Sequence, residues 1–363
     1  MILLLKAASR DRTDLALEDF PAHQIRWATE TGLGPLLQRA IAHDVRARTS
    51  LVWSLVQGAD LTARVINGQQ LDAMDEIIQA CDGHAPPLTL LKGISVCSQH
   101  YPEPHLRVMR DIDVLVDEEA IPTVESRLVR LGYVPRSEYP RAFYETHHHT
   151  TPFFHPRTRV WVEIHRGLFP SGSELGTDRV FGLENIRAEL QPSEFHGRRV
   201  NRLSDELQLV YLASHWAFGL TRVGGVVGVL DAVYLLTHAR ALRWERVLGW
   251  LDGAVASAYV YLLLTYLGRH RLVDVPADVL SALWSRQRAF GHANLRALQA
   301  IIDRYVTGGR EFGVLMSARN FEILRKTLLS PGWPTRNALC LVWNLLPSRV
   351  GLRELLRRAQ ASA

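Results

Sequence analysis

Three short segments carry the most information in this 363-residue chain: LTLLKGIS (residues 88–95), RVMRDIDVLV (107–116) and VWVEIH (160–165). Each is rich in aliphatic residues and is typical of a short buried strand. Each also contains charged residues, which a buried strand does not need for its packing. These charged residues are therefore candidates for a functional site built on a sheet.

The second and third segments contain three acidic residues. Side chains alternate across a strand, so Asp111 and Asp113 point to the same side, with Cα atoms about 6–7 Å apart. Two carboxylates this close are tolerated when they are solvated, when one is protonated or when a cation lies between them. Oxygen ligands favour Mg²⁺ or Mn²⁺, and a neighbouring strand carrying Glu163 would complete a site for two such ions.

The first segment ends in a pattern that favours anion binding. An apolar strand leads into Lys92 and Gly93, and a short helix is predicted over residues 94–100. Glycine lets a ligand approach the backbone, and a helix N-terminus that follows a strand attracts anions. Because Lys92 adds a positive charge, a phosphate-binding turn is expected ahead of the acidic strand.

The order of these features resembles the nucleotidyltransferase superfamily, the fold of DNA polymerase beta and the aminoglycoside nucleotidyltransferases. It is more closely similar to the bacterial group called uncharacterised nucleotidyltransferases. In that group the turn reads Leu-Lys-Gly, an arginine stands four residues before the first aspartate, and the third acid precedes a histidine. Ser95 lies one residue later than the serine of the superfamily turn. The matching residues are Leu91-Lys92-Gly93, Arg107, Asp111-Ile112-Asp113 and Val162-Glu163-Ile164-His165.

The resemblance implies an α+β fold, in which a minimal mixed nucleotidyltransferase sheet is flanked by helical regions. We expect a helical N-terminal region over residues 1–84, the catalytic core over 85–200 and a helical C-terminal domain over 201–363.

Apolar residues at helical spacing predict the helices themselves. In the longest one, the apolar residues at this spacing are Val56, Leu61, Val65, Leu71, Met74, Ile77 and Ile78. The helices predicted before the sheet cover residues 22–31, 36–43 and 51–81, and another covers 121–131. Those predicted after it cover residues 205–220, 224–239, 244–250, 254–269, 277–290, 294–306, 319–328 and 335–346, with a basic amphipathic tail after 347.

The resemblance also implies a transferase, which moves a nucleoside monophosphate from an NTP such as ATP to an acceptor and releases pyrophosphate. The expected acceptor is a small molecule, a sugar phosphate or a modified peptide. The residues expected to hold Mg²⁺ or Mn²⁺ and to act in catalysis are Asp111, Asp113 and Glu163. The residues expected to bind the triphosphate are Lys92, Gly93, Ser95 and Arg107.

Two other functions stay open. One is a non-catalytic nucleotide- or metal-binding regulatory protein, against which the three intact carboxylates argue. The other is a phosphotransferase on the same scaffold, which would yield a nucleoside diphosphate instead of pyrophosphate. For Arg107, an ion pair that fixes Asp111 or Asp113 is as plausible as phosphate binding.

The histidines and one further aspartate have structural alternatives. The run His147-His148-His149 invites a zinc site, but consecutive strand residues point to opposite sides. We therefore favour a strand with one or two histidines at the rim of the site. His165 shares the face of Glu163 and either orients a carboxylate, touches a phosphate or makes a structural hydrogen bond. His215 and Asp231 match a helix pair of the resembled family, and a structural pair is favoured over substrate contact.

Composition limits the partners and the cellular compartment that we expect for this protein. The net charge is +5 with no long basic run, so nucleic acid is not an expected partner. The cysteines Cys81, Cys97 and Cys340 are widely spaced, which favours a reducing compartment over a disulfide framework. No segment reaches the ~18 apolar residues of a spanning helix, and the N-terminus lacks a signal-peptide pattern. We expect a cytoplasmic protein, and the oligomeric state stays open.

Overall fold

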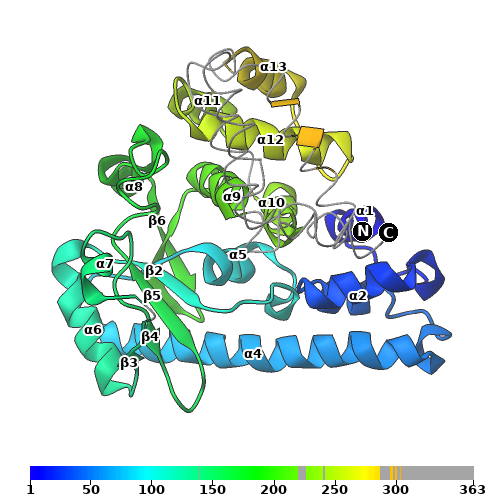
Figure 1. Ribbon diagram of the computed structural model, residues 1–363, viewed down its shortest axis with the longest axis horizontal. Coiled ribbons are helices and arrows are strands. Elements are labelled where there is room, and N and C mark those ends of the chain that lie inside the picture. The colour runs from blue at the N-terminus through cyan, green and yellow to red at the C-terminus, as the bar shows by residue number, and fades with distance from the viewer. Residues whose placement is uncertain are drawn as a thin grey trace, which may run out of the picture.

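The described part of the computed structural model comprises residues 1–137, 139–219, 226–239 and 242–286, with the isolated positions 295–296, 299–300 and 303. Within it, a mixed sheet lies at one end of the molecule, and helices surround it (Figure 1). The predicted α+β class is confirmed.

The sheet of the described chain has seven strands in the order β3-β4-β5-β2-β1-β7-β6. Strand β2 runs parallel to β5 and antiparallel to β1, so the sheet is mixed. This confirms the expectation that the strand of Glu163 lies beside the strand of Asp113. The strands are β1 (Thr89–Leu90), β2 (Ile112–Leu115), β3 (Val134–Pro135), β4 (Phe153–Phe154), β5 (Trp161–His165), β6 (Leu190–Phe195) and β7 (Arg198–Leu203).

The hairpin of β6 and β7 was not predicted from the sequence. Its two-residue turn is formed by His196 and Gly197, whose φ angles are 47° and 77°. Positive φ at both positions is the requirement of a tight hairpin turn, and glycine meets it without steric cost. Strand β7 also pairs in parallel with β1, so the hairpin extends the sheet on the side away from β5.

Helix α4 (Leu51–Cys81) has the predicted bounds and runs the length of the molecule below the sheet and the N-terminal helices (Figure 1). Helix α1 was not predicted, and α5 begins at Lys92, two residues earlier than expected. The other helices up to the sheet's last strand are α1 (Ile2–Ser9), α2 (Ala22–Glu30), α3 (Gly34–Ala40), α5 (Lys92–His100), α6 (Ile121–Arg130), α7 (Arg141–Glu145) and α8 (Leu183–Ala188).

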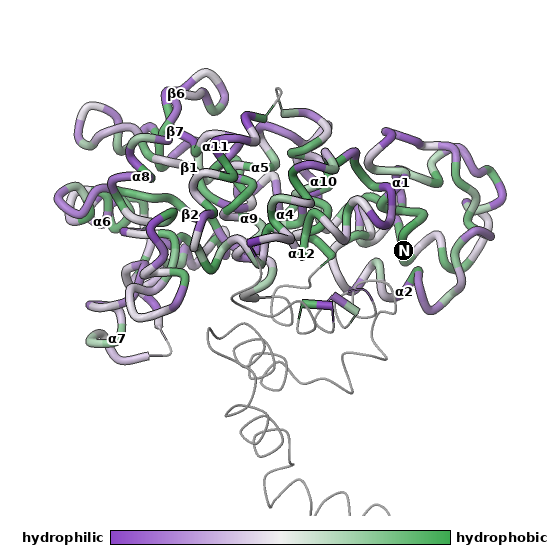
Figure 2. Tube along the Cα trace, turned by 90° about the horizontal axis from the view of Figure 1, so that it is seen from above, coloured by the Kyte–Doolittle hydropathy of each residue, from purple (hydrophilic) through white to green (hydrophobic). Residues whose placement is uncertain are grey.

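The C-terminal helices form the apolar core on the opposite side of the sheet from α4. Hydrophobic residues follow α9, α10 and α12 through the centre of the molecule (Figure 2), and these helices pack on one another. No helix of the described residues is long and apolar enough to cross a membrane. These helices are α9 (Asp205–Gly219), α10 (Val226–His238), α11 (Trp244–Trp250), α12 (Ala256–Arg269) and α13 (Ala277–Arg286). The helices predicted at 294–306, 319–328 and 335–346 and the basic tail lie outside the described residues, apart from a few positions near 300.

Only part of the apolar row of α4 is buried. Val56 and Met74 are buried, but Leu61 and Val65 are exposed. In the middle of the helix the inward residues are polar, namely Asp60, Asn67 and Gln70. The reason is that this part of α4 faces a loop whose backbone groups need hydrogen-bond partners.

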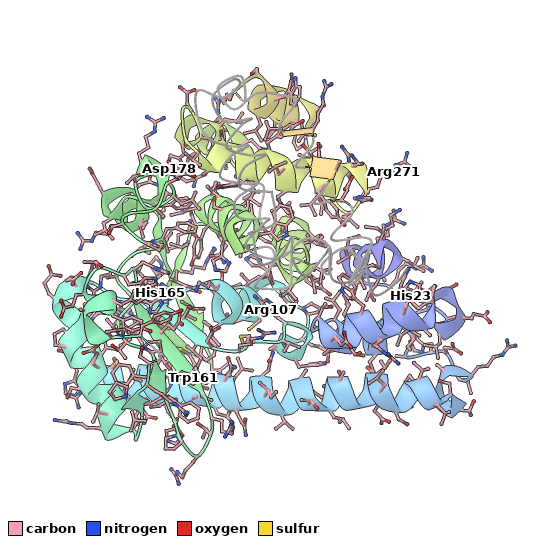
Figure 3. The ribbon with its side chains drawn as sticks, viewed as in Figure 1. His23, Arg107, Trp161, His165, Asp178 and Arg271 are labelled. Carbon is pink, nitrogen blue, oxygen red and sulfur yellow. The ribbon has the colours of Figure 1, made fainter. Side chains whose placement is uncertain are left out.

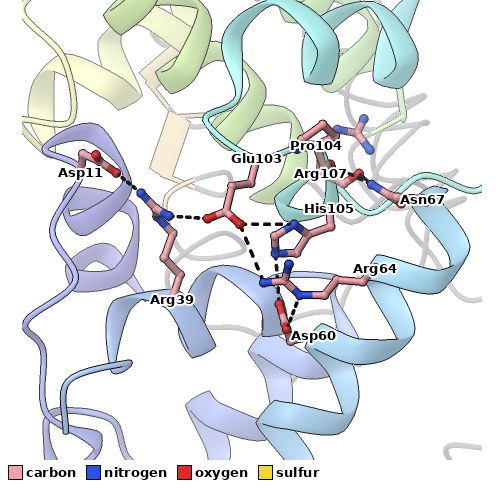
Figure 4. A network of polar contacts seen from close by, with 9 residues as sticks. All are labelled: Asp11, Arg39, Asp60, Arg64, Asn67, Glu103, Pro104, His105 and Arg107. Atoms are coloured by element: carbon pink, nitrogen blue, oxygen red, sulfur yellow. Dashed lines mark hydrogen bonds and ion pairs between the residues drawn. The ribbon is translucent and has the colours of Figure 1, made fainter. Parts of the chain in front are cut away.

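That loop, residues 103–109, precedes the acidic strand, and a polar network fixes it to α4 (Figure 4). The Asn67 amide donates to the carbonyls of Pro104 (2.8 Å) and Arg107 (2.6 Å), and its oxygen accepts from the Met109 N–H (3.2 Å). Further contacts join Asp60 to Arg64 and His105, and Arg39 to Asp11 and Glu103. The network determines where the chain enters β2.

Replacing Asn67 by alanine is expected to lower the free energy of unfolding by about 2–4 kcal/mol, because one buried and two partly buried backbone groups lose their partner. Urea unfolding measures the effect, with Gln69→Ala at an exposed position of the same helix as the control. A difference between the two variants below about 1 kcal/mol would contradict this role for Asn67.

Candidate active site

The carboxylates meet where β2 and β5 lie side by side. Asp113 is the register partner of Glu163, and Asp111 directly precedes β2. The Asp113 side chain is 2% exposed, whereas that of Glu163 is 23% exposed. Residues that are register partners on adjacent strands project to the same face, so the sheet itself brings these two acids together.

Lys92, the first residue of α5, reaches the acids from the end of the strand next to β2. Its φ angle is +46°, an uncommon value for a residue with a Cβ atom, at the point where β1 turns into α5. The backbone conformation costs about 1–2 kcal/mol. In return, the Lys92 ammonium lies 2.7 Å from Oδ1 of Asp113, and the Leu91 N–H donates to the Asp113 carbonyl (3.0 Å). The strained turn therefore places a cation against the buried aspartate.

His165 joins the two acids from within β5 (Figure 3). Its side chain is fully buried, and Nε2 lies 2.7 Å from Asp113 Oδ1 and 3.5 Å from Glu163 Oε2. Carboxylate oxygens only accept, so Nε2 carries the proton. Of the alternatives for this residue, the structure shows the one in which it orients carboxylates.

The two aspartates have opposite protonation behaviour. Burial and the neighbouring charge of Asp113 raise the pKa of Asp111 to about 7. Burial would also raise the pKa of Asp113, but Lys92 and His165 outweigh it and hold that pKa well below its usual range. Burial alone would raise the pKa of Glu163, but the hydrogen bond with His165 and the charges of His149 and Lys92 together lower it. The site thus holds more negative charge than Lys92 neutralises.

The donor set fits a hard divalent cation. Asp113 and Glu163 each offer a carboxylate oxygen within 4.8 Å of the other, whereas the protonated Nε2 of His165 only donates to them. Mg²⁺ and Mn²⁺ bind carboxylate oxygens, and a cation here would remove the repulsion that raises the pKa of Asp111. Of the three carboxylates, Asp113 and Glu163 belong to this group, and Asp111 adjoins it.

Gly93 and Ser95 occupy the first turns of α5. A Cβ atom at Gly93 would lie 3.0 Å from Cγ of Met109, so glycine allows the loop before β2 to pack against the helix. Ser95 is fully buried, and its hydroxyl accepts a hydrogen bond from Gln99 (2.9 Å). The structure therefore gives both residues packing partners within the protein.

Arg107 pairs with neither aspartate of the acidic strand. Its Nε donates to Oδ1 of Asp231 (2.7 Å), and Tyr101 donates to the same oxygen (2.6 Å). The alternative of an ion pair with Asp111 or Asp113 is wrong, and Asp231 has these partners in place of His215. The pair ties α10 to the loop before β2, and Arg107 lies beside α5 (Figure 3).

Two residues of α9 lie close to the acids. Burial and the charge of Lys92 lower the pKa of His215 to about 3, and its ring lies 6.0 Å from that of Tyr211. The Tyr211 hydroxyl is buried and has no hydrogen-bond partner among the described residues. Nothing in the sequence singles out Tyr211, because a tyrosine in an apolar helix indicates no more than core packing.

The segment of His147, His148 and His149 is not a strand. Residues 146–148 form a bend, and only His149 joins the sheet, through an isolated bridge to His165. The predicted strand is therefore wrong at these residues. The rule of alternation applies to extended backbone, and the bend removes it.

The comparisons with known proteins agree with this geometry. Residues 21–268 match the family model described as "Uncharacterised nucleotidyltransferase". The match covers more than half of the chain, so the chain belongs to this family. No curated protein and no solved structure matches it. Family membership supports nucleotidyl transfer as the general activity and an NTP as a substrate.

Proposed function

We propose that the protein transfers a nucleoside monophosphate from an NTP to an acceptor in an Mg²⁺- or Mn²⁺-dependent reaction and releases pyrophosphate. The observation that carries the proposal is the register of β2 and β5, which sets Asp113 beside Glu163 next to the start of α5. The acceptor class is a small molecule, a sugar phosphate or a modified peptide.

Each group has a role that its surroundings favour. Asp111, Asp113 and Glu163 hold the metal ions, which supply the positive charge that stabilises the phosphates as the bond to pyrophosphate breaks. Lys92 and the backbone N–H groups at the start of α5 bind the triphosphate. Arg107 and Ser95 contribute less, since their polar groups already have partners.

One bond forms and one bond breaks in the proposed reaction. The acceptor oxygen forms a bond to the α-phosphorus, and the bond from this phosphorus to the pyrophosphate oxygen breaks. Glu163, the more exposed acid of the register pair, takes the proton of the acceptor. Asp113 stays ionised because Lys92 and His165 hold its pKa low.

The first test measures thermal stability of the protein with each NTP, with and without Mg²⁺. At a hundredfold excess over Kd, a bound nucleotide adds about 2.7 kcal/mol to the stability. The Mg²⁺-dependent shift is expected to disappear in Glu163→Gln and to persist in Glu194→Gln, a variant at an exposed position of β6.

The active nucleotide is then used, labelled at the α-phosphate, with a panel of candidate acceptors. Label on the acceptor together with pyrophosphate supports the proposal. Nucleoside diphosphate as the product would favour a phosphotransferase, and binding without Mg²⁺ dependence would contradict the roles of the acids.

A further inference from the structure

The three consecutive histidines gather their rings at one point beside the acidic site. The ring centroid of His147 lies 4.2 Å from that of His148 and 4.3 Å from that of His149. The ring centroids of His148 and His149 are 4.9 Å apart. One ligand nitrogen from each lies within 4.8 Å of the other two. The bend at residues 146–148 is what turns the side chains together.

The ring nitrogens of this cluster are short of partners. Nδ1 of His147 and Nδ1 of His148 are buried and make no hydrogen bond with any described residue. An unpaired buried polar atom costs about 1–3 kcal/mol. Burial without a charged partner favours the neutral imidazole, which offers a lone pair and is a poor ligand for an anion.

His149 has the hydrogen bond that metal-binding histidines usually make. Its Nδ1 lies 2.7 Å from the carbonyl oxygen of Thr150. A carbonyl can only accept, so Nδ1 carries the proton and Nε2 presents a lone pair. Such a bond to a backbone carbonyl fixes the ring and its tautomer for a metal. The same Nε2 lies 3.8 Å from Oε2 of Glu163.

We propose that His147, His148 and His149 form a binding site for one divalent transition-metal ion of the Zn²⁺ type. Three neutral imidazoles with an open fourth position are the ligand set that Zn²⁺ accepts in tetrahedral geometry. Mg²⁺ prefers oxygen and does not compete here. Phe143 stacks on His147 at 4.8 Å, and Tyr144 lies 5.6 Å from the His149 ring, so two aromatic side chains of α7 lie against the cluster.

This site is distinct in its chemistry from the oxygen-rich acidic site, although Glu163 adjoins both. It does not depend on the proposed transfer reaction. A metal ion here would lie beside β5, because His149 already bridges to His165 in that strand.

The test uses the full-length protein, freed of metal with a chelator, with Co²⁺ as the spectroscopic probe and Zn²⁺ as the competitor. Wild-type protein is expected to give the intense visible absorption of four-coordinate Co²⁺ at one equivalent, and Zn²⁺ is expected to abolish it. His147→Ala/His148→Ala is expected to weaken Zn²⁺ binding by at least about a hundredfold. His23→Ala/His84→Ala, which removes two exposed histidines, is the matched control and is expected to bind as wild type does.

Further controls separate the result from effects on folding and from binding at the acidic site. Circular dichroism checks that the double variant is folded, and His148→Asn serves as a milder variant. Excess Mg²⁺ and the Asp111→Asn variant are expected to leave the Co²⁺ signal unchanged. The proposal is overturned if wild type gives no such signal, if Mg²⁺ or Asp111→Asn removes it, or if folded His147→Ala/His148→Ala binds Zn²⁺ as tightly as wild type.

Discussion

Replacing Asp113 by asparagine is expected to reduce nucleotidyl transfer at least about a thousandfold, because the buried carboxylate is lost from the charge-stabilising centre of the site. The same change is expected to destabilise the fold by about 3–5 kcal/mol, since it leaves the ammonium of Lys92 without its counter-ion. His165 also loses the acceptor that lies 2.7 Å from its Nε2. Pyrophosphate release and urea unfolding measure the two effects.

A second variant separates stability from activity at this position. Asp113→Asn/Lys92→Met removes the unpaired charge along with the carboxylate, so it is expected to recover much of the lost stability. Activity is expected to stay lost, because the metal ligand is still absent. Recovery of transfer in the double variant would contradict the assignment of Asp113, as would an Asp113→Asn protein that is as stable as wild type.

Replacing Asp111 by asparagine is expected to have the opposite effect on stability. Burial and repulsion by Asp113 and Glu163, which Lys92 and Arg107 only partly offset, raise the pKa of Asp111 to about 7. An unfolded aspartate has a pKa of about 3.9. Between these values the folded state binds more protons than the unfolded state, so wild-type stability falls as the pH rises. Asp111→Asn lacks this loss and is expected to be more stable than wild type by on the order of 1–3 kcal/mol at pH 8.

The measurement is urea unfolding at pH 4 and pH 8 in the presence of a chelator, with Asp72→Asn at an exposed position as the control. The gain of Asp111→Asn is expected at pH 8 and not at pH 4, while transfer falls at least about a hundredfold. An equal effect at both pH values would show that electrostatic repulsion at Asp111 is not its cause. A stabilised variant with lost activity would identify Asp111 as a residue retained for function at the expense of stability.

Much of the local structure was predictable from residue patterns. Helix α4 has the predicted bounds, and α9, α10, α11 and α12 begin and end within a few residues of expectation. The acids and Lys92 were identified because charge inside an apolar strand has no packing purpose. The exposed Leu61 and Val65 show the limit of such patterns, since periodicity gives the face of a helix but not what lies against it.

Contacts between residues far apart in the sequence decided the features that residue patterns did not predict. Arg107 meets Asp231 across 124 positions of sequence, and the β6–β7 hairpin joins β1 from the far side of the sheet. The three histidines converge because the chain bends where a strand was predicted.

The sequence by itself determined which residue types this protein brings to its site, because composition and periodicity act within a few neighbouring residues. Only the tertiary structure decided their register and charge state. Asp113 lies opposite Glu163 because β2 pairs with β5, and the pKa values of Asp111 and Asp113 diverge because Lys92 contacts one of them and not the other. Strand pairing and burial are properties of the assembled fold, and they set the chemistry of the same three acids.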